Sequence, residues 1–455
     1  MPAEALPPLL TDPARTAALR LLQAAEDGTR PLDPLLTQLD QGVGLGAGMD
    51  RRDVRLARQL TLGCLRWRLR LDWIAGQFCS RPVAALSPWA RQALRLGLYQ
   101  LLWLDRVPDR AAVHTSVELA KRFAPPGTAN LVNAVLRRAQ RERQRIEYPS
   151  RDEDPVAHLA CRHSHPEWLV ARWLDRYGVE MTERLLQANN AEAPLCVRLN
   201  PQRARSFDEV AGLAGTALHA AGPVPGAFIA AEADVLLASP ACTGGLLLVQ
   251  DMNAALPAAL LAPCPGQRVL DLCAAPGGKT AQLAAAVDGT GLLVSADLSV
   301  TRLDGLRRNA ARLGLANLNL LAQDARRPAL RPGFDRILAD VPCSATGVLG
   351  RHPDARWRRR PEQLAGLAVR QGAILRAAFA LLAPGGALVY STCSLEPEEN
   401  AEVVADFLAR TPQAELEPAR GFFPGQRWAD DYIQTIPGRE PGDGCFAARL
   451  RRRSP

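Results

Sequence analysis

Strand-like and helix-like segments alternate along the chain from about residue 246 onwards. The segments typical of buried strands are GQRVLDLC, GLLVSADLS, LNLLAQDA, FDRILADVPC and GGALVYSTCS. The segments between them with helical periodicity include TRLDGLRRNAARLG and QLAGLAVRQGAILRAAFALL. Strands alternating with helices of this length indicate a doubly wound, mostly parallel α/β sheet of the Rossmann-like kind. In such sheets ligands bind beyond the carboxyl ends of the strands, which is where each distinctive motif of this half falls.

The front part of the chain, from residue 12 to about 145, is predicted to be helical. In LSPWARQALRLGLYQLLWLD, Ser87 is a suitable N-cap, Pro88 occupies the first helical position, and leucines follow at helical spacing. The segment NLVNAVLRRAQRERQRIEY is predicted to form a further helix that ends in a run of arginines. Such a run is usually a solvated face, although on a basic helical domain it can equally face RNA.

Three domains are expected from the length of 455 residues and from the changes of pattern. Residues 156–235 combine a helical segment, HPEWLVARWLDRYG, with short strands such as CVRLN and GAFIA, and PSRDEDP precedes them as a linker. We therefore expect an all-α domain over residues 1–148, a small α+β connecting domain over 149–240, and the α/β domain over 241–455.

The charge balance favours a polyanionic partner. The net charge is +8 and the isoelectric point is about 9.2, which is typical of proteins that bind nucleic acid. An arginine-rich composition is the alternative explanation, because only Lys121 and Lys279 are lysines among the 55 basic residues.

The ten cysteines are scattered, with no C-x-x-C pair, so we expect small buried thiols in a cytoplasmic protein. The segment CRHSH, with Cys161, His163 and His165, has no fourth ligand nearby, so no metal site is expected. No apolar run is long enough to span a bilayer, and the N-terminus lacks the layout of a signal peptide.

The stretch DLCAAPGGKT follows a predicted strand and ends like a phosphate-binding loop. That motif requires a glycine, four further residues and then Gly-Lys, but the position of the first glycine holds Cys273. ATP binding is therefore disfavoured, because the early glycine lets the backbone curl around a phosphate. The alternative is a strand-to-helix turn that binds a cofactor without a triphosphate. Lys279, in a chain that otherwise uses arginine, suggests that a compact ammonium is needed there.

Acidic residues stand at the ends of the next two predicted strands. Asp297 ends the second strand, where an acidic side chain commonly binds both hydroxyls of a ribose. Asp324 follows the third strand, where a carboxylate can accept a hydrogen bond from an adenine amino group. Either aspartate alone could equally be a helix N-cap, but the two together predict a cofactor that contains adenosine.

Two cysteines follow the fourth and fifth predicted strands, in ADVPCSATGVLGRHPD and YSTCSLEPEEN. Cys343 and Cys393 should therefore face one cleft beside the cofactor, with Lys279 as a cation that can lower a thiol pKa. One reaction that needs a nucleophilic thiol beside an adenosine cofactor is methylation of pyrimidine carbon 5. A thiolate adds to carbon 6, and carbon 5 then attacks a methyl sulfonium.

DLCAAPGGKT, ADVPCSATGV…RHPD and YSTCSLEPEEN together strongly resemble the motifs of the RsmB-type (Sun/Fmu) RNA cytosine-C5 methyltransferases. The resemblance extends to VQDMNAALPAALL, GDGCFAARL and SHPEWLV, and the first 145 residues resemble the NusB-like RNA-binding domain of this type. The chain departs from the family at Gly350, where a bulky or basic residue is common, and at Cys445, where an aromatic residue is usual.

The resemblance implies S-adenosylmethionine as cofactor and assigns roles to single residues. Cys393 would be the nucleophile, and Cys343 would assist release of the methylated base. Lys279, the candidate cation inferred above, is predicted to be catalytic beside them. Asp340 would lie between cofactor and target base, where we hypothesise that it stabilises cytosine protonated at N3. The implied cofactor-binding residues are Cys273, Ala274, Ala275, Pro276, Gly277, Gly278, Lys279, Asp297, Asp324 and Asp340.

The resemblance also implies a small-subunit (16S) ribosomal RNA substrate, free or in a partly assembled subunit, and a monomeric enzyme. The target cytosine must leave its stack to reach such a cleft. Arg198 and Asn200 would belong to the RNA channel by resemblance. Four residues beside the Cys343 loop could contact phosphates or stack on bases, or could form an ordinary arginine-rich loop: Arg351, His352, Arg356 and Trp357.

Two alternative functions stay open at this point. The same chemistry could act on transfer RNA, and only the NusB-like front part argues against that. A non-catalytic RNA-binding assembly factor could have kept the fold, although it would not need to retain both cysteines and the whole cofactor loop.

Overall fold

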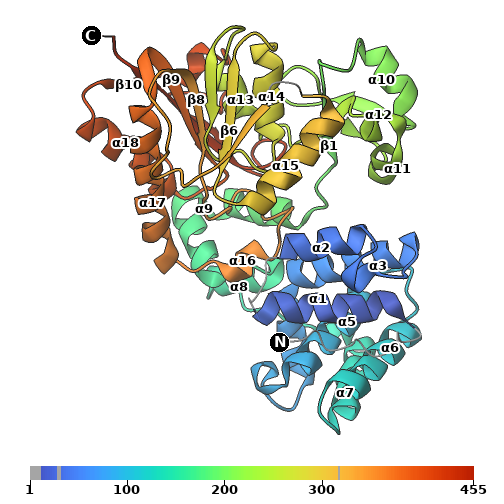
Figure 1. The fold of residues 1–455 in the computed structure, drawn as a ribbon. Helices are drawn as coiled ribbons and strands as arrows, with labels where there is room; N and C mark the ends of the chain where they lie inside the picture. Colours follow the sequence, from blue (N-terminus) through green and yellow to red (C-terminus); the bar gives the residue numbers. More distant parts are fainter. Residues whose placement is uncertain (1–11, 28–31, 316–317, 455) are drawn as a thin grey trace. The chain divides into compact units, whose positions relative to one another are not determined.

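The computed structural model describes residues 12–27, 32–315 and 318–454. The chain divides into two compact units (Figure 1). The helical unit comprises Met1–Asn190 and the short segment His352–Arg358, and the sheet unit comprises Ala191–Arg351 and Arg359–Pro455. The expected boundaries at residues 148 and 240 stay a prediction.

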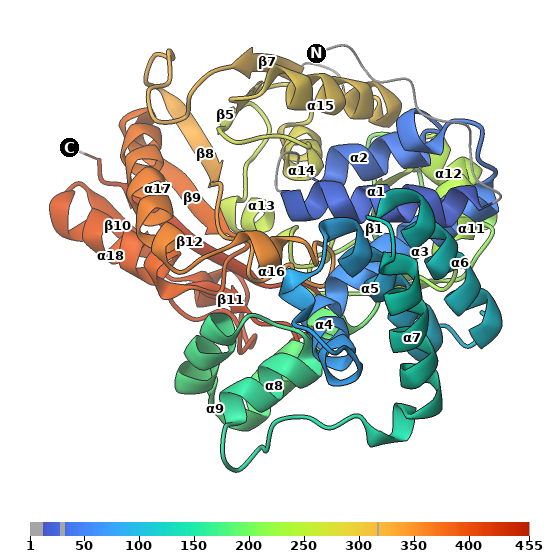
Figure 2. The same cartoon turned by 90° about the horizontal axis from the view of Figure 1, so that it is seen from below.

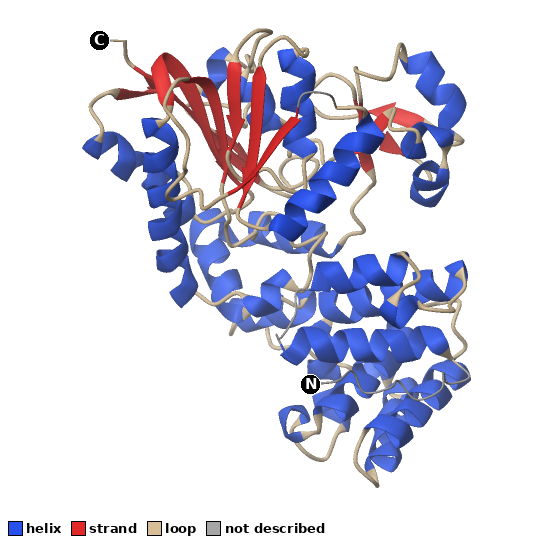
Figure 3. Cartoon of the chain, viewed as in Figure 1, coloured by secondary structure: helices blue, strands red, loops and turns tan. Residues whose placement is uncertain are grey.

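The described part of the helical unit contains helices and no strand (Figure 3). Its helices, grouped together in Figure 2, are α1 (Pro13–Asp27), α2 (Leu32–Asp40), α3 (Arg51–Arg66), α4 (Arg68–Phe78), α5 (Pro88–Trp103), α6 (Asp109–Phe123), α7 (Thr128–Arg141), α8 (Pro155–His163), α9 (Glu167–Asn190) and α16 (Ala355–Arg358). Helix α5 confirms the predicted start, because the Ser87 side chain accepts a hydrogen bond from the Ala90 N–H and Pro88 is the first helical residue.

The arginine-rich helix ends earlier than predicted. Helix α7 stops at Arg141, Glu142 has non-helical backbone angles, and Arg143–Arg145 forms a separate 3₁₀ turn. The positions one turn after Ala139 hold Glu142 and Arg143, so a continued helix would have no apolar side chain there to bury against the core. The predicted helix HPEWLVARWLDRYG is present at the start of α9, which is interrupted at Gly178 (φ 72°).

The sheet unit contains two sheets, drawn in red in Figure 3. The smaller has the order β2-β3-β1-β4 and is antiparallel throughout. Its strands are β1 (Cys196–Leu199), β2 (Leu218–Ala220), β3 (Ala227–Ala230) and β4 (Leu247–Val249). It packs with the helices α10 (Phe207–Ala214), α11 (Ala233–Ala238) and α12 (Pro240–Thr243). The mixed α+β arrangement of this segment agrees with the prediction made from the sequence.

The larger sheet has the order β10-β12-β9-β8-β5-β6-β7, with β11 paired to β12. The five strands from β9 to β7 are parallel, and β12 and β10 extend the β9 edge in antiparallel fashion. The strands are β5 (Arg268–Asp271), β6 (Leu292–Asp297), β7 (Leu318–Ala322), β8 (Phe334–Asp340), β9 (Leu382–Thr392), β10 (Ala414–Glu417), β11 (Ile433–Thr435) and β12 (Cys445–Arg452). The strand order reverses between β5 and β8, which is the position where doubly wound sheets bind ligands.

Helices cover both faces of the larger sheet because the parallel strands are apolar on both sides. In β5, Val269 belongs to the core beneath α13 (Leu256–Leu261) and α14 (Gly278–Val287), with α15 (Val300–Leu313) beside them. The next residue, Leu270, belongs to the core beneath α17 (Glu362–Ala380) and α18 (Ala401–Arg410). The predicted doubly wound sheet is confirmed. Within the described residues, no helix is long and apolar enough to cross a membrane.

Candidate functional site

The thiols of Cys343 and Cys393 face each other at the carboxyl ends of the neighbouring strands β8 and β9. Their Sγ atoms are 3.2 Å apart, and both side chains are partly exposed. The backbone holds the two loops together, since the Val341 N–H donates to the Ser391 carbonyl and the Gly347 N–H donates to the Cys393 carbonyl. The two cysteines therefore lie side by side, while the prediction that they face one cleft with the cofactor stays a prediction.

Glycine is required where the Cys343 loop meets the Cys393 loop. A Cβ on Gly347 would stand 2.8 Å from the carbonyl oxygen of Cys393 and 2.9 Å from Cα of Gly444, which is closer than a side-chain carbon can approach. Ala345 adopts a left-handed backbone conformation (φ 64°), which tightens the turn after Cys343. These two positions allow the loops to approach closely enough for thiol contact.

Lys279 and Asp340 form an ion pair next to the thiols. The Lys279 Nζ donates to Asp340 Oδ2 over 2.7 Å, and the Ser391 hydroxyl donates to Asp340 Oδ1 over 2.7 Å. Burial alone would lower the pKa of Lys279, but the Asp340 carboxylate outweighs burial and raises the pKa above its usual range. Lys279 therefore stays charged, and its ammonium also interacts electrostatically with the Cys393 thiol.

The Cys343 thiol is held in its protonated form. Hydrogen bonding with Cys393 and burial hold the pKa of Cys343 well above its usual range. A protonated Cys343 can donate its S–H toward Cys393 Sγ, 3.2 Å away.

The loop DLCAAPGGKT connects β5 to α14 and closes the other side of the site. Its Ala274 N–H donates to the Ala296 carbonyl at 2.8 Å, and the Ala275 N–H donates to the Asp297 carboxylate at 3.2 Å. Gly277 has φ 108° and precedes the first residue of α14, so a left-handed turn brings the chain into the helix. The loop thereby lies against the end of β6.

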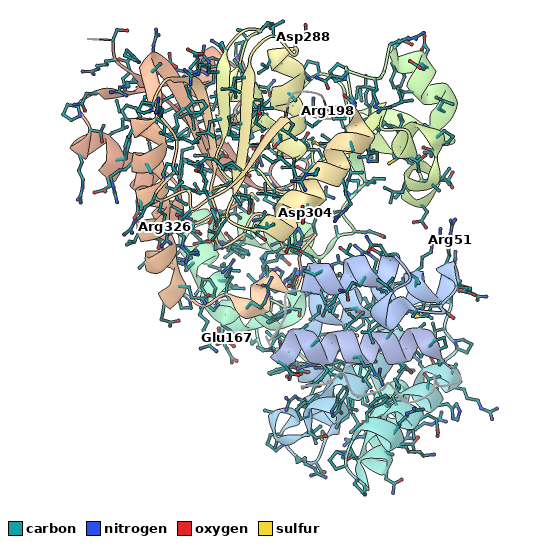
Figure 4. All side chains as sticks on the ribbon, viewed as in Figure 1. Arg51, Glu167, Arg198, Asp288, Asp304 and Arg326 are labelled. Atoms are coloured by element: carbon teal, nitrogen blue, oxygen red, sulfur yellow. The ribbon has the colours of Figure 1, made fainter. Side chains whose placement is uncertain are left out.

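A cavity of about 250 Å³ lies beyond the ends of β5, β6 and β7. It is lined by two carboxylates, Asp297 and Asp324, by the exposed apolar side chain of Leu298, and by the edge of the Cys273 loop. Asp297 pairs with Arg302 at 3.3 Å, and Asp324 pairs with Arg326, labelled in Figure 4, at 2.6 Å. Both arginines are more than half exposed, at 56% and 51%, so they can move aside for a ligand.

These residues fit an adenosine-containing cofactor. Carboxylates at the ends of the second and third strands of the parallel run suit ribose hydroxyls and an adenine amino group, and Leu298 offers an apolar surface for a ring. The hydrogen bonds from Arg326 lower the pKa of Asp324 to about 2, so this carboxylate is an acceptor at neutral pH. The residues that sequence analysis assigned to the cofactor are thus close together in space.

The predicted RNA-contacting residues of the sheet unit have partners within that unit. The Arg198 side chain, labelled in Figure 4, is buried and donates to Gln250 Oε1, and the Asn200 amide donates to the carbonyls of Gly245 and Leu313. Arg351 donates to Asp443 at 2.7 Å and to Asp251 at 2.8 Å, and is 26% exposed. Their RNA contacts stay a prediction.

The segment after Arg351 packs within the helical unit. His352 is 43% exposed and lies 3.4 Å from Asp33. Arg356 is 1% exposed and donates to the carbonyls of Arg66, Ser164 and Asn189, and Trp357 Nε1 donates to the Leu65 carbonyl. The expectation that Arg356 contacts phosphates is wrong, because its guanidinium serves carbonyl groups that would otherwise be buried without donors.

The histidines of the CRHSH segment also contact neighbouring residues of the helical unit. His165 is fully buried, its Nδ1 lies 2.7 Å from the His163 carbonyl, and its ring meets Trp173 edge-on. Among the described residues, no group of three or more histidine, cysteine or acidic side chains is arranged to hold a metal ion.

A buried carboxylate that the sequence analysis did not single out connects the two cysteine loops. Glu399 is fully buried, and its carboxylate accepts hydrogen bonds from Ser344 and Ser394, the residues that follow the two cysteines. Arg359 donates to the carbonyls of Cys343 and Ser344 at 3.0 Å. The motif PEEN contains Glu399, but nothing in its letters distinguishes this glutamate from an exposed one.

Three families match successive parts of the chain. Residues 12–141 match the NusB family, residues 165–228 match the RsmF/B-like ferredoxin-like domain, and residues 258–451 match the family described as 16S rRNA methyltransferase RsmB/F.

Curated relatives match along most of their length. The chain is 41% identical over 408 residues to Ribosomal RNA small subunit methyltransferase B of Pseudomonas putida, covering 88% of this chain and 90% of that protein. It is 38% identical over 444 residues to the protein of the same name from Vibrio vulnificus, covering 96% and 98%. A solved structure of a methyltransferase homologue from Pyrococcus horikoshii is 28% identical with a TM-score of 0.57, covering 66% of this chain and 99% of that one.

The fold, the site and the relatives together define an RNA methyltransferase that depends on S-adenosylmethionine. Its NusB-like helical region precedes the methyltransferase region along the chain. The chain belongs to the RsmB/F family of 16S rRNA methyltransferases.

Proposed function

We propose that this protein methylates carbon 5 of one cytosine in small-subunit ribosomal RNA through a covalent adduct with Cys393. The observation that carries the proposal is the pair of thiols 3.2 Å apart at the ends of β8 and β9, beside the Lys279–Asp340 ion pair. A methyltransferase that modifies an oxygen or an amino nitrogen needs no such thiol pair. Methylation of a pyrimidine carbon does need a nucleophile, because carbon 5 of the free base is too weakly nucleophilic.

S-adenosylmethionine supplies an electrophilic methyl group when it is bound. We assign its binding to the loop from Cys273 to Lys279 and to three carboxylates: Asp297 for the ribose, Asp324 for the adenine amino group, and Asp340 at the boundary with the target base. The loop lies against the carboxylate of Asp297, so a single cavity can hold the nucleoside part.

The Cys393 thiolate adds to carbon 6 of the flipped cytosine, and its electron pair shifts the density of the ring toward carbon 5. Carbon 5 would then take the methyl group, and the bond from the methyl carbon to the sulfonium sulfur would break to leave a neutral thioether. Asp340 faces the ring at N3, where a proton balances the charge that develops during addition. Its two oxygens already accept from Lys279 and Ser391, but each carboxylate oxygen has a second lone pair.

Cys343 assists the second half of the reaction, in which a base takes the carbon-5 proton, the electron pair restores the double bond between carbons 5 and 6, and Cys393 is expelled from carbon 6. Its raised pKa keeps Cys343 neutral beside Cys393, which suits a group that handles protons and not a second nucleophile. The expelled Cys393 sulfur then regains its place in the hydrogen bond with Cys343.

The net charge of +8 and the NusB-like region support an RNA substrate. That a monomer binds it rests on the family resemblance alone. We retain Arg198, Asn200, Arg351 and His352 as candidate contacts. Because the first three have partners within the sheet unit, RNA would have to replace or extend those partners.

The test supplies the purified protein with radiolabelled S-adenosylmethionine and either a 16S rRNA transcript or bulk transfer RNA. Bisulfite sequencing then locates 5-methylcytosine. Label at one cytosine of the 16S transcript, lost in Cys393→Ser, is the expected result. Label in transfer RNA alone would favour the other substrate, and binding of the transcript without methylation of either RNA would favour an assembly factor.

A further inference from the structure

The strongest unassigned feature of the site is a carboxylate that is buried without a cation. Glu399 is fully buried, and among the described residues no ion pair involves it. A buried glutamate of this kind is costly unless hydrogen bonds satisfy its oxygens. Four donors do so here, and all of them come from the two cysteine loops or from the helix that packs beneath them.

The donors to Glu399 connect three separate parts of the chain. Oε1 accepts from the Ser344 N–H and from Gln371 Nε2, both at 2.8 Å. Oε2 accepts from the hydroxyl of Ser394 at 2.6 Å and from the hydroxyl of Ser344. Ser344 directly follows Cys343 and Ser394 directly follows Cys393. One carboxylate therefore fixes the residue next to each thiol.

The glutamate itself is held in place by its own backbone and by the strand beneath it. The Tyr390 hydroxyl donates to the Glu399 carbonyl at 2.5 Å, and the next residue, Asn400, accepts from Thr392 Oγ1 at 2.6 Å and donates to the Ser394 carbonyl at 2.8 Å. Glu399 is consequently a fixed point relative to β9. Movement of either serine away from it would leave buried polar atoms unpaired.

We propose that Glu399 is a positioning residue that sets the separation between the Cys343 and Cys393 thiols through Ser344 and Ser394. It does not touch the reacting atoms. It acts by holding two loops whose cysteines must cooperate on one base, a task in which a displacement of about 1 Å can cost on the order of 100-fold in rate.

The first test measures the thiol geometry without RNA or cofactor, so it does not depend on the proposed function. Treatment with diamide oxidises two adjacent thiols to a disulfide while the diazene is reduced to a hydrazine. We expect wild type to form the Cys343–Cys393 disulfide, identified by peptide mass mapping, and Glu399→Gln to form it about tenfold more slowly. Glutamine keeps the size of the side chain but replaces one acceptor oxygen by an amide donor.

The matched control is Glu402→Gln, which removes the same charge from an exposed position on the following helix, α18. It should oxidise at the wild-type rate. Thermal unfolding of each variant shows whether it folds, and Ser394→Ala serves as a milder variant that removes only one of the four donors. Folded Glu399→Gln and Ser394→Ala proteins that both oxidise at the wild-type rate would overturn the inference.

The second test rests on the proposed function and uses a double-mutant cycle on methylation. If Glu399 works by placing Cys343 relative to Cys393, Glu399→Gln should lower the rate of methyl transfer in a single turnover, which Cys343→Ala can also complete, about tenfold in the wild-type background. It should have a much smaller effect once Cys343 has been replaced by alanine. Equal effects in the two backgrounds would refute positioning of the pair, whereas a failure of methylation in every protein would refute the proposed function and leave the diamide result standing.

Discussion

The site has two sides that are built differently. On the cofactor side, Asp297 and Asp324 line an open cavity and pair with arginines that are more than half exposed. On the thiol side, Cys343 and Cys393 sit on loops whose polar groups are satisfied by buried partners, above all Glu399. The cofactor side can exchange its present partners for a ligand, whereas the thiol side is held by hydrogen bonds within the protein. Substitutions should therefore affect binding on one side and chemistry on the other.

The largest effect is expected for Cys393→Ala. If Cys393 is the nucleophile, as we propose, its removal should lower the methylation rate by about 10⁴-fold or more, because the addition step is lost. The dissociation constant for S-adenosylmethionine should stay within about twofold, since Cys393 does not line the cofactor cavity. Initial rates and calorimetric titration measure the two quantities. The exposed Cys264→Ala serves as control, and a variant at Cys393 that still methylates would separate the thiol from the chemistry.

The ion pair that joins the two sides should give the next largest effect. Lys279→Met leaves the Asp340 carboxylate, which is 30% exposed, without its cation. We expect a loss of about 2 kcal/mol in the free energy of unfolding, less than for a fully buried pair, and a loss of about 100-fold in methylation. Urea unfolding measures the first. Adding Asp340→Asn to Lys279→Met should restore the free energy of unfolding but not methylation. If stability were not restored, the unpaired Asp340 carboxylate would not be the cause of its loss.

On the cofactor side, Asp297→Asn should weaken binding of S-adenosylmethionine by about 10- to 100-fold, as expected for loss of a hydrogen bond to a charged group. Asp324→Asn should have a smaller effect because its carboxylate is more exposed to water. The same calorimetric titration measures both variants. Asp304→Asn on α15, which removes a charge from an exposed surface pair with Arg307, should leave affinity unchanged. If Asp304→Asn weakened binding as much as Asp297→Asn, the loss of affinity would reflect the change in net charge and not a lost contact with the ligand.

The last prediction concerns the pH dependence of stability, where no change in methylation or cofactor binding is at issue. Burial raises the pKa of Asp271, at the end of β5, to about 7, from 3.8 in an exposed chain. Between these values the folded protein binds more protons than the unfolded chain, so the free energy of unfolding falls as the pH rises from 4 to 7. The shift corresponds to a difference on the order of 4 kcal/mol across that window.

Asp271→Asn should flatten this dependence while keeping an oxygen for the Thr280 hydroxyl. Thermal unfolding of both proteins from about pH 5 to pH 8 measures the difference, and contributions from other groups cancel in the comparison. Parallel curves for the two proteins would show that Asp271 does not carry the shift.

The cofactor side could be predicted from the sequence because strand ends are ordered along the chain. Asp271, Asp297 and Asp324 follow successive parallel strands, and the fold places such ends along one edge. The facing positions of Cys343 and Cys393 were predictable for the same reason, since β8 and β9 are neighbours.

The hydrogen bonds around Glu399 that hold the two cysteine loops were not predictable, because they connect residues distant in sequence. Glu399 accepts hydrogen bonds from Ser344, Gln371 and Ser394 only after the two cysteine loops and α17 have packed around it. Burial of a glutamate has no periodic signature. The same limit explains Arg356, which looks like a surface arginine in an arginine-rich segment but satisfies buried carbonyls.

In the proposed mechanism, Cys393 attacks the base and Cys343 assists release of the methylated base from Cys393. The most direct measurement incubates Cys343→Ala with S-adenosylmethionine and a 16S rRNA transcript that the wild-type protein methylates. A denaturant-stable protein–RNA complex, linked through Cys393 in peptide mapping, should accumulate in this variant and be absent from Cys393→Ala. No complex in Cys343→Ala, or a complex in Cys393→Ala linked through Cys343, would contradict this division of roles.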